Sequence, residues 1–171
     1  MRIVKAAEHH IQEIAKVHVD SWKETYNTIV NAEAIQKKTY RKREELWQRI
    51  IQENQSITYA AKTNDGKIVG FINGGKERTG TYDYDAEIYA VYILQAYQGQ
   101  KIGKKLIHTI TGKLYEQGHR SIMVWVIENN PSKYFYEKLD GKSIDRKYLD
   151  YLGVYEVAYG WNDMKVLFKK D

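Results

Sequence analysis

The spacing of hydrophobic residues divides the chain into helical and extended segments. In some stretches apolar residues recur every three or four positions, which predicts amphipathic helices, and in others they alternate or run together, which predicts strands. The predicted helices begin near residue 11 and span 32–52, 102–117 and 132–139, and the predicted strands span 2–6, 56–62, 67–75, 86–94, 121–127, 142–151 and 154–168, the last interrupted at 160–163.

The order of these segments favours an α+β fold. Hairpins, such as the one around the Asn-Asp-Gly-Lys turn at 64–67, are mixed with crossover helices, which argues for a central mixed sheet of about seven strands with helices on both faces. Segment 121–127 is apolar on both faces and should be a buried central strand. The 171 residues contain no linker or repeat, so one domain over 1–171 is expected.

The junction between strand 86–94 and helix 102–117 carries the most informative chemistry. A glycine-containing turn before a helix leaves backbone N–H groups without partners at the positive end of the helix dipole, which is a site for phosphate. Lysines add positive charge to the same corner. We therefore expect a phosphate-bearing ligand held by the main chain of Gln98, Gly99, Gln100, Lys101, Ile102, Gly103 and Lys104.

Composition limits the other function classes. The chain has 27 Lys and Arg against 22 Asp and Glu, a net charge of +5 with the signs interspersed, and no cysteine. Cysteine chemistry is therefore excluded, and the histidines show no zinc-protease spacing. Neither a secretory signal nor an apolar run of the ~20 residues that a membrane span needs is present, so a cytoplasmic location is expected. Nucleic-acid binding is the rival class, but it requires a basic stripe with stacking aromatics.

Two segments together resemble the GNAT superfamily of acyl-CoA-dependent N-acetyltransferases. The first is the loop 98–103, Gln-x-x-Lys-x-Gly, which is similar to the family's Gln/Arg-x-x-Gly-x-Gly/Ala. The second is the block 129–139, Asn-x-x-Ser-x-x-Phe-Tyr-x-x-Leu. The order of elements extends the resemblance over most of the chain, which looks like a bacterial member that acts on small molecules.

The chain departs from the family pattern at two glycines. Lys101 stands where the family usually has glycine, and Asp140 separates Leu139 from Gly141. Glycine permits unusual dihedrals and a close approach of the backbone to a pyrophosphate. A lysine at position 101 is expected to keep ordinary helical dihedrals, which would alter the loop.

The resemblance implies acetyl-CoA as the cofactor and no metal. The pantetheine arm would lie where strand 86–94 separates from strand 121–127, and the N–H group of Ile93 would stabilise the oxyanion. The pyrophosphate would bind the N–H groups from Gln98 onward. The expected cofactor-binding residues are Val91, Tyr92, Ile93, Gln98, Gly99, Gln100, Lys101, Ile102, Gly103, Lys104, Asn129, Ser132 and Tyr136.

The resemblance also implies two catalytic residues. At neutral pH a lysine-like amine costs about 4.6 kcal/mol to deprotonate, so a base or a water relay is needed, and Glu87 is the candidate. Tyr136 occupies the family position for the acid that protonates the leaving thiolate. Candidates for the acceptor pocket are Trp22, Tyr26, Asp85, Tyr89 and Trp161.

The expected function is direct acetyl transfer to a primary amine in a ternary complex. Acidic residues near the acceptor end would favour a polyamine or another small cationic amine. A protein or peptide acceptor is the alternative, as is a coenzyme A-binding or nucleic-acid-binding module without catalysis. The last two strands could pair across a homodimer.

Overall fold

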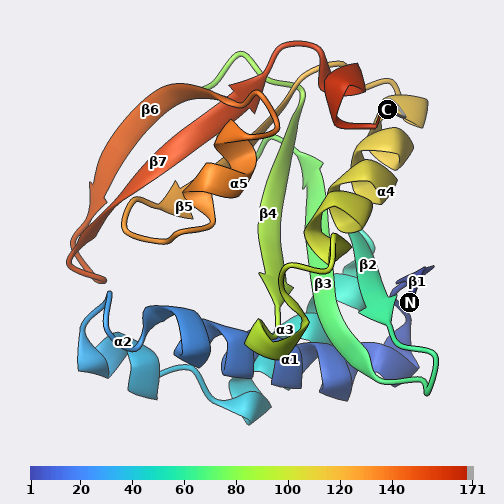
Figure 1. Cartoon of the computed structure of the whole chain (residues 1–171), viewed down its shortest axis with the longest axis vertical. Helices are drawn as coiled ribbons and strands as arrows, with labels where there is room; N and C mark the ends of the chain where they lie inside the picture. The colour runs from blue at the N-terminus through green and yellow to red at the C-terminus, as the bar shows by residue number, and fades with distance from the viewer. Residues whose placement is uncertain (169–171) are drawn as a thin grey trace.

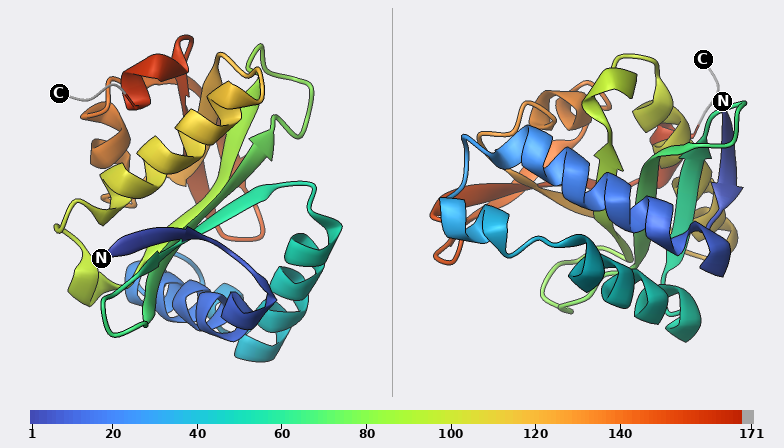
Figure 2. Two further views of the ribbon diagram at one scale, coloured as in Figure 1. Left: turned by 90° about the vertical axis from the view of Figure 1, so that its right-hand side faces the viewer. Right: turned by 90° about the horizontal axis from the view of Figure 1, so that it is seen from below.

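The computed structural model describes residues 1–168, in which seven strands form one sheet in the order β1-β2-β3-β4-β5-β7-β6, with helices on both faces (Figures 1 and 2). This confirms the predicted mixed α+β fold. The strands are β1 (Arg2–Lys5), β2 (Ile57–Lys62), β3 (Ile68–Lys76), β4 (Ala86–Ile93), β5 (Ile122–Ile127), β6 (Lys142–Leu149) and β7 (Val154–Trp161). The α-helices are α1 (Ile11–Tyr26), α2 (Ala32–Gln36), α3 (Tyr40–Glu53), α4 (Ile102–Glu116) and α5 (Lys133–Glu137), with 3-10 turns η1 (Glu8–His10), η2 (Gln95–Tyr97) and η3 (Met164–Leu167).

Side-chain caps explain the two largest differences between the elements and the prediction. The predicted helix 32–52 is two helices, because Thr39 takes extended dihedrals and its hydroxyl accepts a hydrogen bond from the Lys42 N–H group, which starts α3. The predicted last strand, 154–168, ends at Trp161. Asp163 then caps η3 by accepting a hydrogen bond from the Lys165 N–H group at 3.0 Å.

Two apolar layers cover the sheet. On one face α4 buries the stripe that its sequence predicts, including Leu106 and Ile110, against β2 to β5. On the other face α1 and α3 bury Ile14 and Trp47 against Phe71 of β3. The left panel of Figure 2 shows the sheet between α4 and the pair formed by α1 and α3. This sandwich fixes β4 at the centre of the molecule.

The sheet loses its continuity between β4 and β5. These parallel strands pair only from Ala86–Ile122 to Ile88–Val124, and beyond that point β4 pairs with β3 while β5 pairs with β7. A bulge in β4 lies at the same place. Asn73 and Gly74 of β3 face Ala90 and Ile88, so Tyr89 is an extra residue in β4. The predicted separation of the two strands is therefore confirmed.

The bulge changes the direction of the side chains along β4. Ile88 and Val91 both pack on the α4 side of the sheet, although they are three residues apart, whereas Ala90 and Tyr92 pack on the α1 and α3 side. In a regular strand residues three apart point to opposite faces. The second half of β4 thus presents its backbone to the gap at a different angle from the first half.

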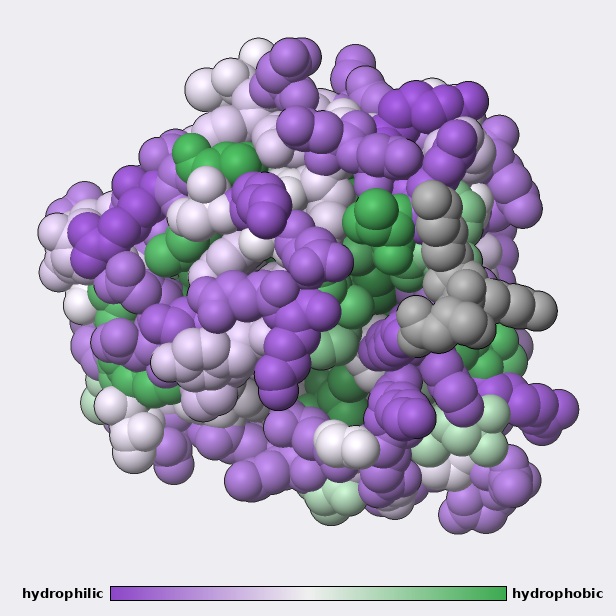
Figure 3. Space-filling view, turned by 45° about the horizontal axis from the view of Figure 1, so that its top comes forward, coloured by the Kyte–Doolittle hydropathy of each residue, from purple (hydrophilic) through white to green (hydrophobic). Residues whose placement is uncertain are grey.

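The surface of the molecule exposes few hydrophobic residues together. The face drawn in Figure 3 is mostly hydrophilic, with hydrophobic residues in small separate groups. Within residues 1–168, no helix is long and apolar enough to cross a membrane. Over the same residues, no group of three or more histidine, aspartate or glutamate side chains could hold a metal ion.

The backbone at Lys101 corrects one expectation. Lys101 does not adopt ordinary helical dihedrals but the left-handed conformation, with φ 61° and ψ 13°. Asp140 does the same, with φ 61°. Both residues stand at the positions where the chain departs from the family's glycines, so the glycine-like backbone is retained without the glycine. For an L-residue this conformation costs roughly 1–2 kcal/mol.

Replacing Lys101 by glycine should therefore leave the protein as stable or up to about 1 kcal/mol more stable, because relief of the left-handed strain offsets the added chain entropy. Lys105 is the matched control, since it is exposed in the first turn of α4. Glycine there should cost roughly 1 kcal/mol. Urea unfolding without ligand measures both variants, and equal losses would contradict the left-handed assignment.

Candidate functional site

A cleft of about 960 Å³ opens where β4 and β5 separate. Its walls come from α1, β4, the loop before α4, β5, α5 and the β6–β7 hairpin, so elements far apart in the sequence meet there. Most of the predicted site residues line it. They are Trp22, Tyr26, Glu87, Tyr89, Val91, Tyr92, Ile93, Gln98, Gly99, Lys101, Ile102, Gly103, Lys104, Ser132 and Tyr136.

Two predicted acceptor residues do not reach the cleft. The Asp85 carboxylate accepts hydrogen bonds from the N–H groups of Arg120 at 2.7 Å and Ser121 at 3.2 Å, and these bonds lower the Asp85 pKa. Its role is to join the start of β4 to the start of β5. The Trp161 indole donates to the Leu139 carbonyl at 2.6 Å and is buried beside α5.

Two predicted cofactor residues, Gln100 and Asn129, also lie outside the cleft lining. Asn129 is exposed, while its neighbour Asn130 is buried and lines the cleft. The Asn130 side chain donates to the Tyr26 hydroxyl at 2.8 Å and accepts from the Ser132 N–H group at 2.9 Å. Its place directly before Pro131 at a helix start is the sequence signal that would have identified it.

The backbone before α4 forms an amide loop, residues 99–103. Among residues 1–168 these five N–H groups have no hydrogen-bond acceptor. Gly99 has φ +75° and nothing within 4 Å of where a side chain would begin, and at Gly103 an added Cβ would lie 3.3 Å from Phe135. The loop therefore offers open N–H donors at a helix start, which fits a diphosphate.

The backbone of β4 faces the gap on the adjoining wall. The Leu94 N–H group donates to the Val69 carbonyl at 3.0 Å, toward β3. Because main-chain groups alternate in direction along a strand, those of Ile93 and Val91 point away from β3 toward the gap. The Ile93 carbonyl accepts a hydrogen bond from the Gln98 side chain at 2.9 Å, which ties the strand to the amide loop.

Tyr136 projects from α5 into the cleft. Its side chain is only 6% exposed, and its hydroxyl makes no hydrogen bond within the described part of the chain. Burial, and secondarily the nearby Tyr26, raise the Tyr136 pKa above its ordinary value. The hydroxyl therefore stays protonated at neutral pH and is available to donate.

Glu87 lies on the opposite wall and is paired with an arginine that the sequence did not suggest. The Glu87 carboxylate is 2% exposed and accepts two hydrogen bonds from the Arg78 guanidinium, from Nε at 3.1 Å and from Nη2 at 2.5 Å. Hydrogen bonding to Glu87 raises the Arg78 pKa. Arg78 also stacks 4.3 Å from the ring centre of Tyr89, whose hydroxyl donates to the Lys76 carbonyl.

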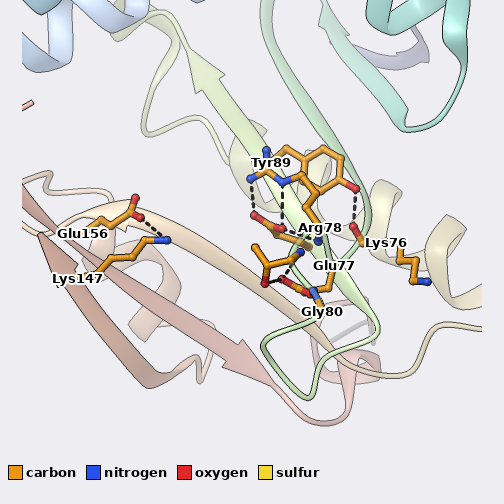
Figure 4. A network of polar contacts seen from close by, with 9 residues as sticks. Lys76, Glu77, Arg78, Gly80, Tyr89, Lys147 and Glu156 are labelled. Carbon is orange, nitrogen blue, oxygen red and sulfur yellow. Dashed lines mark hydrogen bonds and ion pairs between the residues drawn. The ribbon is translucent and has the colours of Figure 1, made fainter. Parts of the chain in front are cut away.

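The pairing of Glu87 restricts its chemistry. The Arg78 guanidinium occupies both carboxylate oxygens, so less of the carboxylate is open to accept a hydrogen bond from a substrate. A second pair, Lys147 of β6 with Glu156 of β7 at 3.1 Å, also lines the cleft and lies apart from Arg78 and Tyr89 in Figure 4. Lys147 also lies 4.0 Å above the Trp125 ring.

The wall near α1 holds a cation that sequence reasoning also missed. Lys38, in the link between α2 and α3, lines the cleft with its Nζ 4.6 Å from the ring centre of Trp22. Burial, and then the charge of Arg43, lower the Lys38 pKa to about 8. In the sequence Lys38 follows another lysine, and no motif distinguishes the two.

Known proteins share this sequence pattern and this fold. The model of the acetyltransferase (GNAT) family matches residues 11–141. The uncharacterised N-acetyltransferase YuaI of Bacillus subtilis is 34% identical over 161 residues, which cover 92% of this chain and 90% of YuaI.

Solved structures agree in fold. PaiA N-acetyltransferase of Thermoplasma acidophilum, in complex with coenzyme A, superposes with a TM-score of 0.72 at 23% identity, over 94% of this chain and 98% of PaiA. An N-acetyltransferase of Staphylococcus aureus Mu50 superposes with a TM-score of 0.73 at 18% identity, over 95% and 98%. Together with the family match, these likenesses show that the chain belongs to the acetyltransferase (GNAT) family and is an acetyl-CoA-dependent N-acetyltransferase.

Proposed function

We propose that the protein transfers an acetyl group directly from acetyl-CoA to the primary amine of a small molecule, with both substrates bound at once. One observation carries this proposal. A single cleft joins the amide loop, the free backbone of β4, Tyr136 and Glu87. Acetyl-CoA supplies a thioester carbonyl and a thiolate leaving group, and the chain supplies the groups that bind, orient and exchange protons.

The amide loop and β4 are suited to hold the two ends of the cofactor. The open N–H groups of residues 99–103 match a diphosphate, and Lys101 and Lys104 line the same part of the cleft. The N–H groups of Val91 and Ile93 point into the gap where the pantetheine arm would lie. The Ile93 N–H group would donate to the carbonyl oxygen as negative charge develops on it.

Tyr136 is proposed as the acid that protonates the departing sulfur. A phenol, with pKa ~10, is protonated at neutral pH. The thiolate that leaves is the conjugate base of a thiol with pKa ~8.5 and can accept a proton. Burial raises the Tyr136 pKa further, which keeps the hydroxyl protonated but makes it a weaker acid. The hydroxyl therefore first donates a hydrogen bond to the sulfur, and the proton moves only as negative charge develops there. No other group among residues 1–168 accepts the hydroxyl proton in a hydrogen bond, which leaves the donor available.

Glu87 is proposed to act through water. The carboxylate is locked to Arg78, so it is better suited to orient a water molecule that takes the amine proton than to take that proton itself. The two hydrogen bonds from Arg78 hold the carboxylate in one orientation. This assigns the pair to one function, positioning a proton relay at the acceptor end of the cleft.

The acceptor end gives no support for a polyamine. That expectation depended on acidic residues, but Asp85 bonds to backbone N–H groups outside the cleft, and the carboxylates of Glu87 and Glu156 are paired with cations. The remaining wall carries Lys38. A protein N-terminus or lysine remains the alternative acceptor, and a turnover screen that includes peptides would detect it.

Coenzyme A should stabilise the protein, and the diphosphate should supply much of the effect. At a free ligand concentration of ~100 times the dissociation constant, the free energy of unfolding should rise by about 2.7 kcal/mol. Pantetheine, which lacks the diphosphate, is the matched control and should give a much smaller shift at equal concentration. Urea unfolding measures both. Equal shifts would contradict binding at the amide loop.

Replacing Tyr136 by phenylalanine should lower kcat by about 10²- to 10⁴-fold, the usual range for loss of a general acid. Stabilisation by coenzyme A should persist, because the ring remains. Tyr134→Phe is the control, since Tyr134 lies on the same helix but is 56% exposed and does not line the cleft. Steady-state kinetics at saturating acetyl-CoA measure both variants, and unchanged turnover in Tyr136→Phe would assign the proton to another donor.

Replacing Glu87 by glutamine should lower kcat and move the pH profile of kcat/KM to higher pH. The amide keeps the shape but loses the charge that orients the relay, so more of the amine must be deprotonated by the solvent before it reacts. The pH dependence of initial rates tests this. A reduced rate with an unmoved profile would mean that Glu87 serves only to hold Arg78.

A further inference from the structure

Lys38 at the acceptor end of the cleft and Arg43 behind it have no ion-pair partner within residues 1–168. Lys38 lines the cleft above the Trp22 ring, and Arg43 lies one turn into α3 beside Tyr92. The Arg43 Nε atom is buried and has no hydrogen-bond partner within residues 1–168. A buried donor without a partner in a native protein calls for an explanation, such as an ion or a ligand group that completes it.

The charged groups around this pair leave it uncompensated. Asp20 is engaged by Lys16 at 2.5 Å and by the Tyr40 hydroxyl at 2.6 Å. His18 accepts a hydrogen bond from the Trp47 indole and is neutral, because burial and then Arg43 and Lys38 lower its pKa to about 3.

The other charges of the acceptor end are already neutralised. Arg78 is paired with Glu87, and Lys147 is paired with Glu156. Within residues 1–168 no carboxylate forms an ion pair with Lys38 or Arg43. Burying a charge without a partner costs free energy, so an anionic group supplied by a ligand would be bound favourably there.

From this arrangement we infer that the acceptor carries a carboxylate as well as its amine, and that Lys38 binds that carboxylate with Arg43 behind it. The substrate class is a free amino acid. The inference rests on the proposed acetyl transfer. Trp22, Tyr26 and Tyr92 provide an aromatic floor beside Lys38 on which the amino acid's side chain would lie.

The reaction balances without a further reactant. The amine nitrogen forms a bond to the acetyl carbon, and the carbon–sulfur bond breaks. Starting from the ammonium form, nitrogen loses two protons through water beside Glu87. The thiolate takes a proton from Tyr136, and Tyr136 recovers a proton from water, so one proton is released to the solvent. The products are an N-acetylamino acid and coenzyme A, and the carboxylate on Lys38 is unchanged.

The test compares each primary-amine amino acid with its α-carboxamide, which has the same shape without the charge. Lysine with cadaverine and arginine with agmatine are added as pairs that lack the carboxylate altogether. At least one amino acid should have a kcat/KM about 10- to 100-fold above that of its uncharged partner, which is the usual value of a charge-assisted hydrogen bond.

The variant Lys38→Met should reduce that preference about 10- to 100-fold, mainly through KM, and Lys38→Arg should restore part of it. Lys37→Met is the matched control, because Lys37 is exposed, does not line the cleft and pairs with Glu33 at 2.6 Å. The Lys37→Met variant should keep the preference for the amino acid over its uncharged partner. Stabilisation by coenzyme A checks that each variant is folded.

Three outcomes would overturn the inference. If the carboxamides or diamines are the better substrates, or if Lys38→Met lowers kcat/KM equally for both members of a pair, Lys38 does not recognise a carboxylate and direct acetyl transfer to amines still stands. If no amine is acetylated by a protein that coenzyme A stabilises, the proposed function fails and the inference fails with it.

Discussion

The site exists because β4 and β5 stop pairing after Ile88 and Val124. A strand that leaves its neighbour exposes backbone N–H and C=O groups that must find other partners. On the β3 side the partners are maintained across the bulge, so the fold keeps its stability while the other edge of β4 opens. The β5 edge is supported in the same way by pairing with β7. The cleft therefore depends on β4 and β5, each of which pairs with its other neighbour, β4 with β3 and β5 with β7.

Local sequence patterns predict much of the fold, but they do not predict much of the candidate site. Hydrophobic periodicity predicts α4 and the central strand β5, and the glycines between 98 and 104 identify the amide loop. Arg78 lies in a connection without periodicity, and Lys38 lies in the link where the predicted helix 32–52 divides into α2 and α3. Arg78 meets Glu87 nine residues away through a hairpin, and Lys38 meets Trp22 through the packing of three helices, so neither contact has a local signal.

The left-handed residues show where tertiary structure overrides local preference. A lysine at 101 and an aspartate at 140 favour right-handed dihedrals, yet both adopt the conformation typical of glycine. At Lys101 this turn presents the N–H groups of the amide loop, and at Asp140 it is followed by Gly141, where an added Cβ would collide with Trp161. Strain at such positions persists only when the surrounding structure imposes it.

The charged residues that line the cleft affect the pKa of an amine bound there. Its described lining contains five lysine or arginine residues and two glutamates, and both glutamates are paired with cations. A positive environment lowers the pKa of a bound amine, and each unit removes about 1.4 kcal/mol from the ~4.6 kcal/mol needed to deprotonate it. We propose that the same charges attract a diphosphate at one end and a carboxylate at the other. A polycation would gain neither contact, whereas an amino acid would be attracted through its carboxylate while its amine is driven toward the reactive form.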